Sequence, residues 1–187
     1  MSLLLKTFLA SILSISLSFG GISYQNVYNK ARAYTNNPYY VVVDLTKPST
    51  EKRFYIYDSR TGSVIYSTYV AHGAGSGRGV YVTSVSNQEN SGSTSVGVYY
   101  TREYYNGKHG RVLRVQGIEK GFNDNAYNRL IEVHGAKYIG NGLSGHSLGC
   151  FAVPMDQMPY ILNILRPNTL IIAYYPDSNW LHNSKFL

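Results

Sequence analysis

One cysteine and one upstream histidine are the residues whose types and spacing point most directly to chemistry. Cys150 is the only cysteine and stands in SGHSLGCFAVP, while His134 ends an apolar run in EVHGA. A thiol near neutral pH needs a base or a positive neighbour to form a thiolate, and a nearby histidine provides it. The turn-rich segment 137–145 can fold back and bring the two side chains together. The pattern therefore predicts Cys150 as a nucleophile and His134 as its base.

The residues just before Cys150 suit a catalytic loop. Gly149 allows a tight turn and would leave the amides of Gly149 and Cys150 facing a developing oxyanion. Ser147 is expected to orient a neighbouring group or to brace the loop. The plain alternative is a core thiol, because free cysteine is among the most buried residue types. The Gly-Cys turn and the upstream histidine favour catalysis.

Metal and cofactor sites fit the sequence less well. His134, His146 and Cys150, joined by His72, would supply zinc ligands, but their spacing matches no zinc motif. The glycine-rich segment 73–79 lacks the Gly-Lys-Ser/Thr of a phosphate-binding loop and the glycine spacing of a dinucleotide fingerprint. We therefore expect no metal and no cofactor. Papain-like enzymes place cysteine before histidine, which is the reverse of the order here.

Short apolar runs separated by turn residues indicate the elements that position this pair. They predict a mainly β fold, a sandwich or barrel with one helix on the C-terminal side. Met155, Met158, Ile161, Leu162 and Leu165 have helical spacing, so the helix is expected over 154–165 with Asp156 as its cap. The expected strands cover 39–45, 53–58, 63–70, 96–101, 112–117, 130–135 and 170–175. A short apolar piece at 80–85 lies within a Gly/Ser/Asn-rich stretch over 73–97 that is expected to be a long loop.

The N-terminal segment is typical of an export signal. Lys6 precedes an apolar stretch over 8–19 that is too short and too rich in serine to span a bilayer well. We expect a signal peptide over 1–22, a linker or first covering segment over 23–38, a catalytic domain over 39–176 and a loose tail over 177–187. The location follows as periplasm or cell envelope, without stable membrane insertion after cleavage. An uncleaved anchor is the alternative.

Composition limits the partners. The formal charge is +7, but its 17 lysines and arginines are scattered rather than gathered in one run, so we expect no nucleic-acid binding. A single cysteine cannot form an internal disulfide in an oxidising compartment. We expect a monomer.

Two segments carry a resemblance to a known family. HGAKYI and SLGCFAVP resemble the signature of the YkuD-like L,D-transpeptidase catalytic domains, which reads His-Gly, a gap, then Ser-x-Gly-Cys. Further blocks resemble the murein L,D-transpeptidase catalytic-domain branch in order, among them YVAHGAGSG, TSVGVYYT, EYYNGKHG and LRVQGIEKGFNDNAYNR. The resemblance covers roughly 41–174.

The resemblance implies a β-rich catalytic domain that acts on peptidoglycan stem peptides. Cys150 would attack the carbonyl on the L-side of an L,D peptide bond, form a thioester and expel the terminal D-residue. An amine of a second stem would then take the acyl group, with His134 as base in both half-reactions. If water replaces the amine, the protein is an L,D-carboxypeptidase. A third alternative is an inactive envelope-binding protein.

Two positions depart from the family pattern. Leu148 stands where many relatives carry histidine, and His146 stands where the closer branch carries arginine, so His146 is either a weaker anion partner for a stem carboxylate or a space filler. The other candidates for substrate binding are Gly135, Arg129, His72, Asn87 and Tyr99. Each has a plainer alternative in surface exposure or loop packing. His109 is expected to be structural or exposed.

Overall fold

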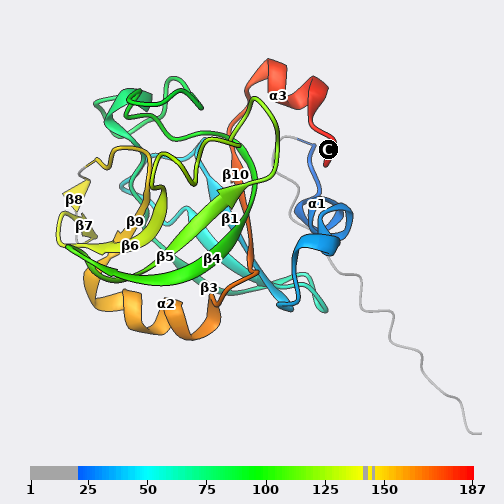
Figure 1. Cartoon of the computed structure of the whole chain (residues 1–187), viewed down its shortest axis with the longest axis horizontal. Helices are drawn as coiled ribbons and strands as arrows, with labels where there is room; N and C mark the ends of the chain where they lie inside the picture. The colour runs from blue at the N-terminus through cyan, green and yellow to red at the C-terminus, as the bar shows by residue number, and fades with distance from the viewer. Residues whose placement is uncertain (1–20, 141–142, 145) are drawn as a thin grey trace, which may run out of the picture.

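One mixed sheet of eight strands dominates the molecule (Figure 1). The computed structural model describes residues 21–140, 143–144 and 146–187, and the expected signal peptide lies almost wholly outside them. The strand order is β3-β2-β1-β10-β4-β5-β6-β9, and the sheet is not closed. The bounds are β1 Tyr39–Asp44, β2 Phe54–Asp58, β3 Ser63–Thr68, β4 Gly97–Gly107, β5 Gly110–Gly117, β6 Glu132–Ala136, β9 Phe151–Pro154 and β10 Leu170–Tyr174. A small pair, β7 Ile139–Gly140 and β8 Leu143–Ser144, stands apart from the sheet.

The central strands are apolar throughout because both faces of the sheet are covered. β1 and β10 run parallel, and Val41 and Val43 point into one core cluster while Tyr40 and Val42 point into another. Strands buried on both faces read as continuous apolar runs rather than as alternation. This accounts for the YYVVV stretch of β1.

The first face is covered by helix α2 (Met158–Ile164), which follows a 3₁₀ turn at Met155–Gln157. Ile161 of α2 is fully buried in the core. The helix starts later than the sequence indicated because Pro154 still belongs to β9, where it pairs with Ala136. Gln157 stands at the N-cap without a side-chain hydrogen bond, so the expected cap by Asp156 is wrong.

The second face is covered by α1 (Tyr24–Lys30) and α3 (Ser178–Asn183), which lie on the same side of β1 and β10 (Figure 1). The described part of the chain therefore has three short α-helices rather than one. Of the two alternatives for 23–38, a linker or a first covering segment, the structure supports the covering segment, because Tyr24, Val27 and Tyr28 of α1 are buried against the sheet. The expected loose tail is likewise anchored, since Trp180 is fully buried.

The mainly β expectation is confirmed, with differences in detail. Residues 80–85 lie in a long loop, as expected, and this loop also holds the 3₁₀ turn Ala74–Ser76. β9 was not expected, because its four residues directly follow the cysteine motif and are too few to show a period. The other expected strands are present.

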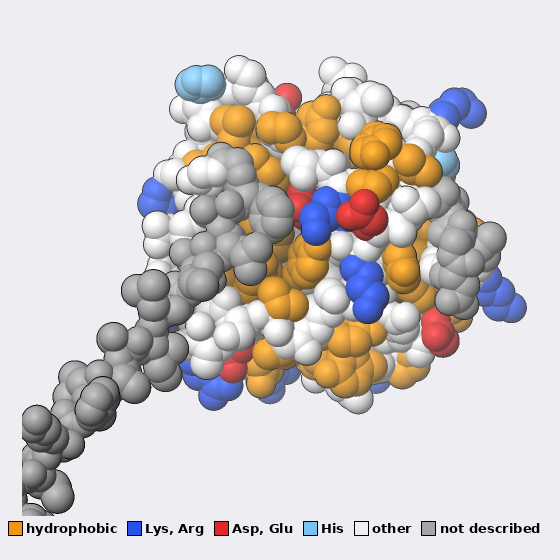
Figure 2. Space-filling view, turned by 180° about the vertical axis from the view of Figure 1, so that it is seen from behind, with side chains coloured by type: hydrophobic (Ala, Val, Ile, Leu, Met, Phe, Trp, Pro, Cys, Tyr) orange, Lys and Arg blue, Asp and Glu red, His pale blue; other side chains and the backbone are white. Residues whose placement is uncertain are grey.

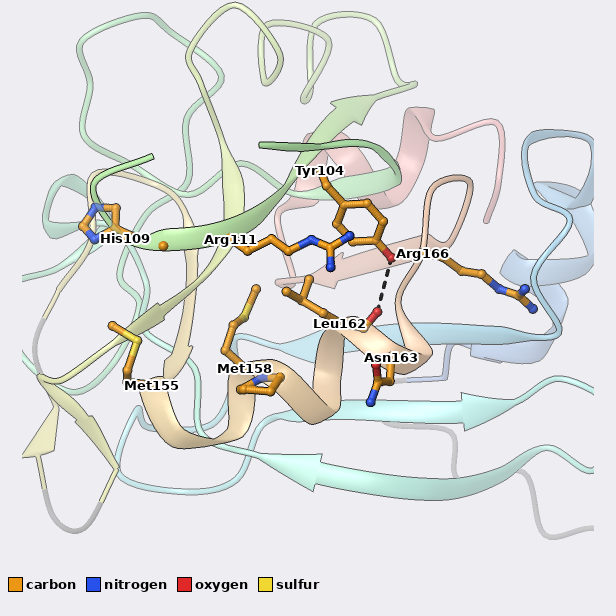
Figure 3. Close-up of a pocket in the computed structure, with 10 residues that line it drawn as sticks. Tyr104, His109, Arg111, Met155, Met158, Leu162, Asn163 and Arg166 are labelled. Atoms are coloured by element: carbon orange, nitrogen blue, oxygen red, sulfur yellow. Dashed lines mark hydrogen bonds between the residues drawn. The ribbon is translucent and has the colours of Figure 1, made fainter. Parts of the chain in front are cut away.

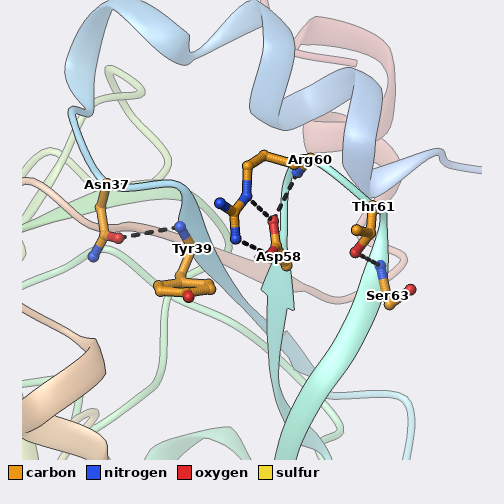
Figure 4. A network of polar contacts seen from close by, with 6 residues as sticks. All are labelled: Asn37, Tyr39, Asp58, Arg60, Thr61 and Ser63. Carbon is orange, nitrogen blue, oxygen red and sulfur yellow. Dashed lines mark hydrogen bonds and ion pairs between the residues drawn. The ribbon is translucent and has the colours of Figure 1, made fainter.

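Side-chain hydrogen bonds fix the turn between β2 and β3 (Figure 4). The Asp58 carboxylate accepts hydrogen bonds from Arg60 Nε at 3.0 Å and from the Arg60 amide at 2.9 Å. These bonds lower the pKa of Asp58 to about 2. Thr61 Oγ1 accepts from the Ser63 amide at 3.2 Å, which completes the turn.

Charges of both signs are interspersed with hydrophobic side chains on the face shown in Figure 2. No large single-sign patch is visible on that face. Within the described residues, no helix is both long and apolar enough to cross a membrane.

Candidate active site

The sheet itself brings the predicted pair together. β6 and β9 are neighbouring parallel strands, with Val133 opposite Phe151 and His134 opposite Ala152. Val133 and Phe151 point into the core, so strand alternation turns His134 to the other face. Cys150 directly precedes Phe151, and its side chain lines the same cleft of roughly 660 Å³ as His134.

His134 is oriented by its own strand. Its Nδ1 lies 3.1 Å from the Gly135 carbonyl oxygen, and because a carbonyl can only accept, Nδ1 carries the hydrogen. The second ring nitrogen, Nε2, is thereby left as an acceptor. Burial lowers the pKa of His134, and nearby His109 and Lys108 lower it further. The imidazole is therefore neutral near pH 7 and has the form of a general base.

Cys150 rests as a protonated thiol. Its Sγ donates to the Leu130 carbonyl oxygen at 3.7 Å. Burial raises the pKa of the thiol to about 11, although a hydrogen bond from the Glu132 backbone and the charge of Arg129 act in the opposite direction. The thiol thus needs a base at the moment of attack rather than a preformed ion pair.

The cysteine loop is braced by Ser147. Its hydroxyl donates to the Cys150 carbonyl at 2.8 Å and accepts from the Gly149 amide at 3.1 Å. The expectation that the Gly149 amide would be free for an oxyanion is therefore wrong, because the short turn folds the Ser147 hydroxyl back onto it. Gly149 has φ +116°, and a Cβ there would lie 2.6 Å from the Ser93 carbonyl oxygen, so glycine is required.

The two histidines beyond this pair occupy different places. His146 lines the cleft and donates from Nε2 to the Gly79 carbonyl at 2.8 Å. His72 lies behind it, with the ring centroids 5.0 Å apart. His72 is fully buried, accepts from Arg53 Nη2 at 2.8 Å and is not among the cleft residues. Burial, aided by the Arg53 charge, lowers the pKa of His72 to about 4.

Arg129 lines the cleft and is committed to the loop beside it. Its guanidinium donates to the carbonyls of Ser86 at 3.0 Å and Ser93 at 2.5 Å. Burial lowers the pKa of Arg129. Arg129 therefore contributes a positive charge to the cleft, and hydrogen bonds to two backbone carbonyls hold its guanidinium in place.

Three other sequence candidates do not line the cleft. The Cα of Gly135 faces the 3₁₀ turn before α2, where a Cβ would lie 2.8 Å from Met155 Sδ. Gly135 therefore acts through the carbonyl that orients His134. Asn87 donates to Asp124 at 2.7 Å and joins two loops. Tyr99 is fully buried and packs edge-on against Phe151, with ring centroids 5.5 Å apart.

His109, expected to be structural or exposed, lies at the active site. Its ring stacks on His134 with centroids 4.3 Å apart and an interplanar angle of 21°. Gly107 pairs with Gly110, so His109 lies in the two-residue tip of the β4–β5 hairpin. The two glycines in NGKHG, which flank Lys108 and His109, are the feature of the sequence that indicates a tight hairpin turn at this position. Tyr138, Glu132, Lys108 and Leu130 also line the cleft and were not singled out.

The described residues contain no group of three or more His, Cys, Asp or Glu side chains that could hold a metal ion. The absence of a metal and of a cofactor stays a prediction. The chemistry available in the cleft is that of a thiol and an imidazole that line the same cavity.

A family model described as "L,D-transpeptidase catalytic domain" matches residues 15–174. No curated protein matches the chain.

Solved structures that resemble the chain include an L,D-transpeptidase from Mycobacterium smegmatis, at 14% identity, TM-score 0.46 and coverage of 74% of this chain and 59% of that one. L,D-transpeptidase 3 from Mycobacterium tuberculosis, in complex with a faropenem-derived adduct, is 12% identical with a TM-score of 0.48, and the match covers 74% of this chain and 60% of that one. The Bdellovibrio bacteriovorus protein Bd1075 is 14% identical with a TM-score of 0.48, and the match covers 74% of this chain and 48% of that one. The chain thus spans about half to three fifths of the length of these proteins.

Proposed function

The chain belongs to the L,D-transpeptidase catalytic-domain family, and on that premise we propose that it is an exported cysteine enzyme of peptidoglycan. Cys150 takes the acyl group of a stem tetrapeptide and passes it to an amine of a second stem. The observation that carries this proposal is the shared cleft of Cys150 and His134, with the His134 ring held in the tautomer that a base needs.

In the first half-reaction the thiol attacks the carbonyl on the L-side of the terminal L,D bond. The thiol proton moves to His134 Nε2 as the new C–S bond forms. The C–N bond to the terminal D-residue then breaks, and His134 returns the proton to the leaving amine. The product is a thioester on Cys150.

In the second half-reaction an amine attacks the thioester carbonyl. The new C–N bond forms, the C–S bond breaks, and the amine proton passes through His134 Nε2 to the departing sulfur. The same base serves both steps because it is regenerated after the first. Ser147 acts on neither bond; it positions Cys150 through the carbonyl contact.

The binding of the stem is assigned to the cationic side of the cleft. Arg129, His146 and Lys108 line it, and carboxylates of a stem peptide are the matching charges. His146 is the weaker partner, because its Nε2 already donates to the Gly79 carbonyl at 2.8 Å.

The test is muropeptide analysis with wild-type protein, Cys150→Ala and His134→Ala, with His182→Ala as an exposed control. Wild type and the control should convert tetrapeptide muropeptides to crosslinked dimers with release of the terminal D-residue. The rate of this conversion should fall at least about a hundredfold in both active-site variants, because general-base catalysis alone contributes about that factor or more. Full activity in Cys150→Ala would overturn the proposal.

Two other outcomes identify the alternatives. Tripeptide without dimer assigns L,D-carboxypeptidase activity, in which water takes the place of the amine. Binding to isolated sacculi that is equal in wild type and Cys150→Ala, without any product, assigns an envelope-binding protein.

A further inference from the structure

A second cavity adjoins the active-site cleft. It has a volume of roughly 650 Å³ and lies between α2 and the β4–β5 hairpin. His109 lines both cavities and is the wall between them. In Figure 3, His109 and Met155 lie at one end of the cavity and Arg166 at the other. The second cavity is therefore a groove that leads away from the His134 side of the site.

The groove has an apolar floor and a cationic rim. Met155, Met158 and Leu162 form the floor. Arg111 and Arg166 supply charge from exposed positions, and no acidic residue lines the cavity. The ion pairs found among the described residues leave both arginines unpaired with a carboxylate.

The rim is partly fixed before any ligand arrives. The Arg111 guanidinium lies over the Tyr104 ring, 4.1 Å from its centroid. The Tyr104 hydroxyl in turn donates to the Leu162 carbonyl at 3.3 Å, as the dashed line in Figure 3 shows. A stacked guanidinium keeps its donors available for a carboxylate while losing little freedom on binding.

We propose that this groove binds the acceptor stem peptide, an inference that rests on the proposed function. A stem peptide presents methyl groups and carboxylates along one short chain, which suits a floor of Met and Leu under two arginines. The donor must lie in the other cavity, because its scissile carbonyl has to reach Cys150. The acceptor amine has to reach the thioester carbonyl on Cys150 and pass its proton to His134. His109, which lines both cavities, is stacked on the His134 ring.

Binding is tested without catalysis. Calorimetry on Cys150→Ala protein measures the Kd of a stem tripeptide whose third residue is a diamino acid with a free side-chain amine. Arg111→Gln and Arg166→Gln, each added to that background, should raise the Kd about tenfold, the loss expected for one charge-assisted hydrogen bond. Arg32→Gln, an exposed arginine on the other side of the sheet, is the matched control and should leave the Kd unchanged. A double Arg111→Gln/Arg166→Gln protein that binds within twofold of the background would overturn the groove.

Kinetics separate the acceptor from the donor. With saturating tetrapeptide donor, the two arginine variants should raise the KM for the tripeptide acceptor about tenfold and change kcat less. If they instead slow thioester formation on Cys150 by as much as they slow transfer, the groove holds the donor and the acceptor assignment is wrong. If wild type forms no thioester at all, the proposed function fails, while the calorimetry still decides whether the groove binds the peptide.

Discussion

Burial acts on the Cys150 thiol and the His134 imidazole in ways that fit one mechanism. It raises the pKa of the thiol to about 11 and lowers the pKa of the imidazole below its ordinary value. Both groups are therefore neutral near pH 7, and the proton moves only when substrate is attacked. At this scale the sequence predicted the pair and the brace by Ser147. It could not show that the Gly149 amide is already bonded, because this depends on how the turn closes.

The state of the thiol can be tested by alkylation. Because the thiolate is the reactive form and the pKa of the thiol is raised to about 11, Cys150 is almost wholly protonated at pH 7. The rate with iodoacetamide should be low at neutral pH and climb about tenfold per unit as the pH rises toward 11. Intact-mass kinetics between pH 5 and 10 give the profile. A fast rate that stays flat from pH 5 to 8 would mean a preformed thiolate–imidazolium pair.

Gly149 allows a matched test of the turn. Gly149→Ala introduces a Cβ at positive φ that meets the Ser93 backbone, whereas Gly121, at φ +83°, has nothing within 4 Å of its Cβ position. Gly121→Ala should cost about 1–2 kcal/mol of unfolding free energy from the backbone conformation alone. Gly149→Ala should cost more than that and also abolish thioester formation. Urea denaturation and acylation kinetics measure the two effects, and equal losses in both variants would contradict the account.

At the scale of elements, the β4–β5 hairpin is as important as the strands that carry the pair. Its two-residue tip places His109 on His134, a contact that the expectation of a structural or exposed residue did not include. The apolar runs predicted the strands, because a buried strand is made of apolar residues that are visible in the sequence. The stacking could not be predicted, since it depends on the curvature and register of the hairpin, including the irregularity between Thr101 and Tyr104.

The stacking makes a prediction of its own. His109→Ala should lower the rate of thioester formation about tenfold, because the His134 ring loses the aromatic face that holds it, whose value is of the order of 1 kcal/mol. His109→Phe keeps an aromatic ring and should lose much less. Rates by rapid-quench mass spectrometry, with His182→Ala as control, separate the two. Equal rates in Ala and Phe variants would show that stacking plays no part.

At the scale of the molecule, both faces of the sheet are apolar and must be covered by other elements to keep them from water. The sequence predicted the mainly β class and the helix after β9. It left the segment that forms α1 open between a linker and a covering segment, and assigned the segment that forms α3 to a loose tail. Those segments are short and polar in composition, so their few buried side chains carry too little periodic signal. Burial of Tyr24 and Trp180 depends on the second face of β1 and β10, which local patterns do not reveal.

The cover by α3 can be measured directly. Trp180 is fully buried, and its indole N–H lies 3.2 Å from the Glu119 carboxylate. Trp180→Ala should reduce the free energy of unfolding by about 3–5 kcal/mol, as for other buried aromatic residues. His182→Ala, on the exposed side of the same helix, should change it by less than about 0.5 kcal/mol. A change below about 1 kcal/mol for Trp180→Ala in chemical denaturation would mean that the tail is loose after all.

The central claim is that Cys150 carries the acyl group, and intact-protein mass spectrometry tests it most directly. Wild-type protein mixed with stem tetrapeptide should gain the mass of the stem without its terminal D-residue, and peptide mapping should place the adduct on Cys150. Cys150→Ala should gain nothing. An adduct on another residue, or transfer activity in Cys150→Ala without any adduct, would contradict the account.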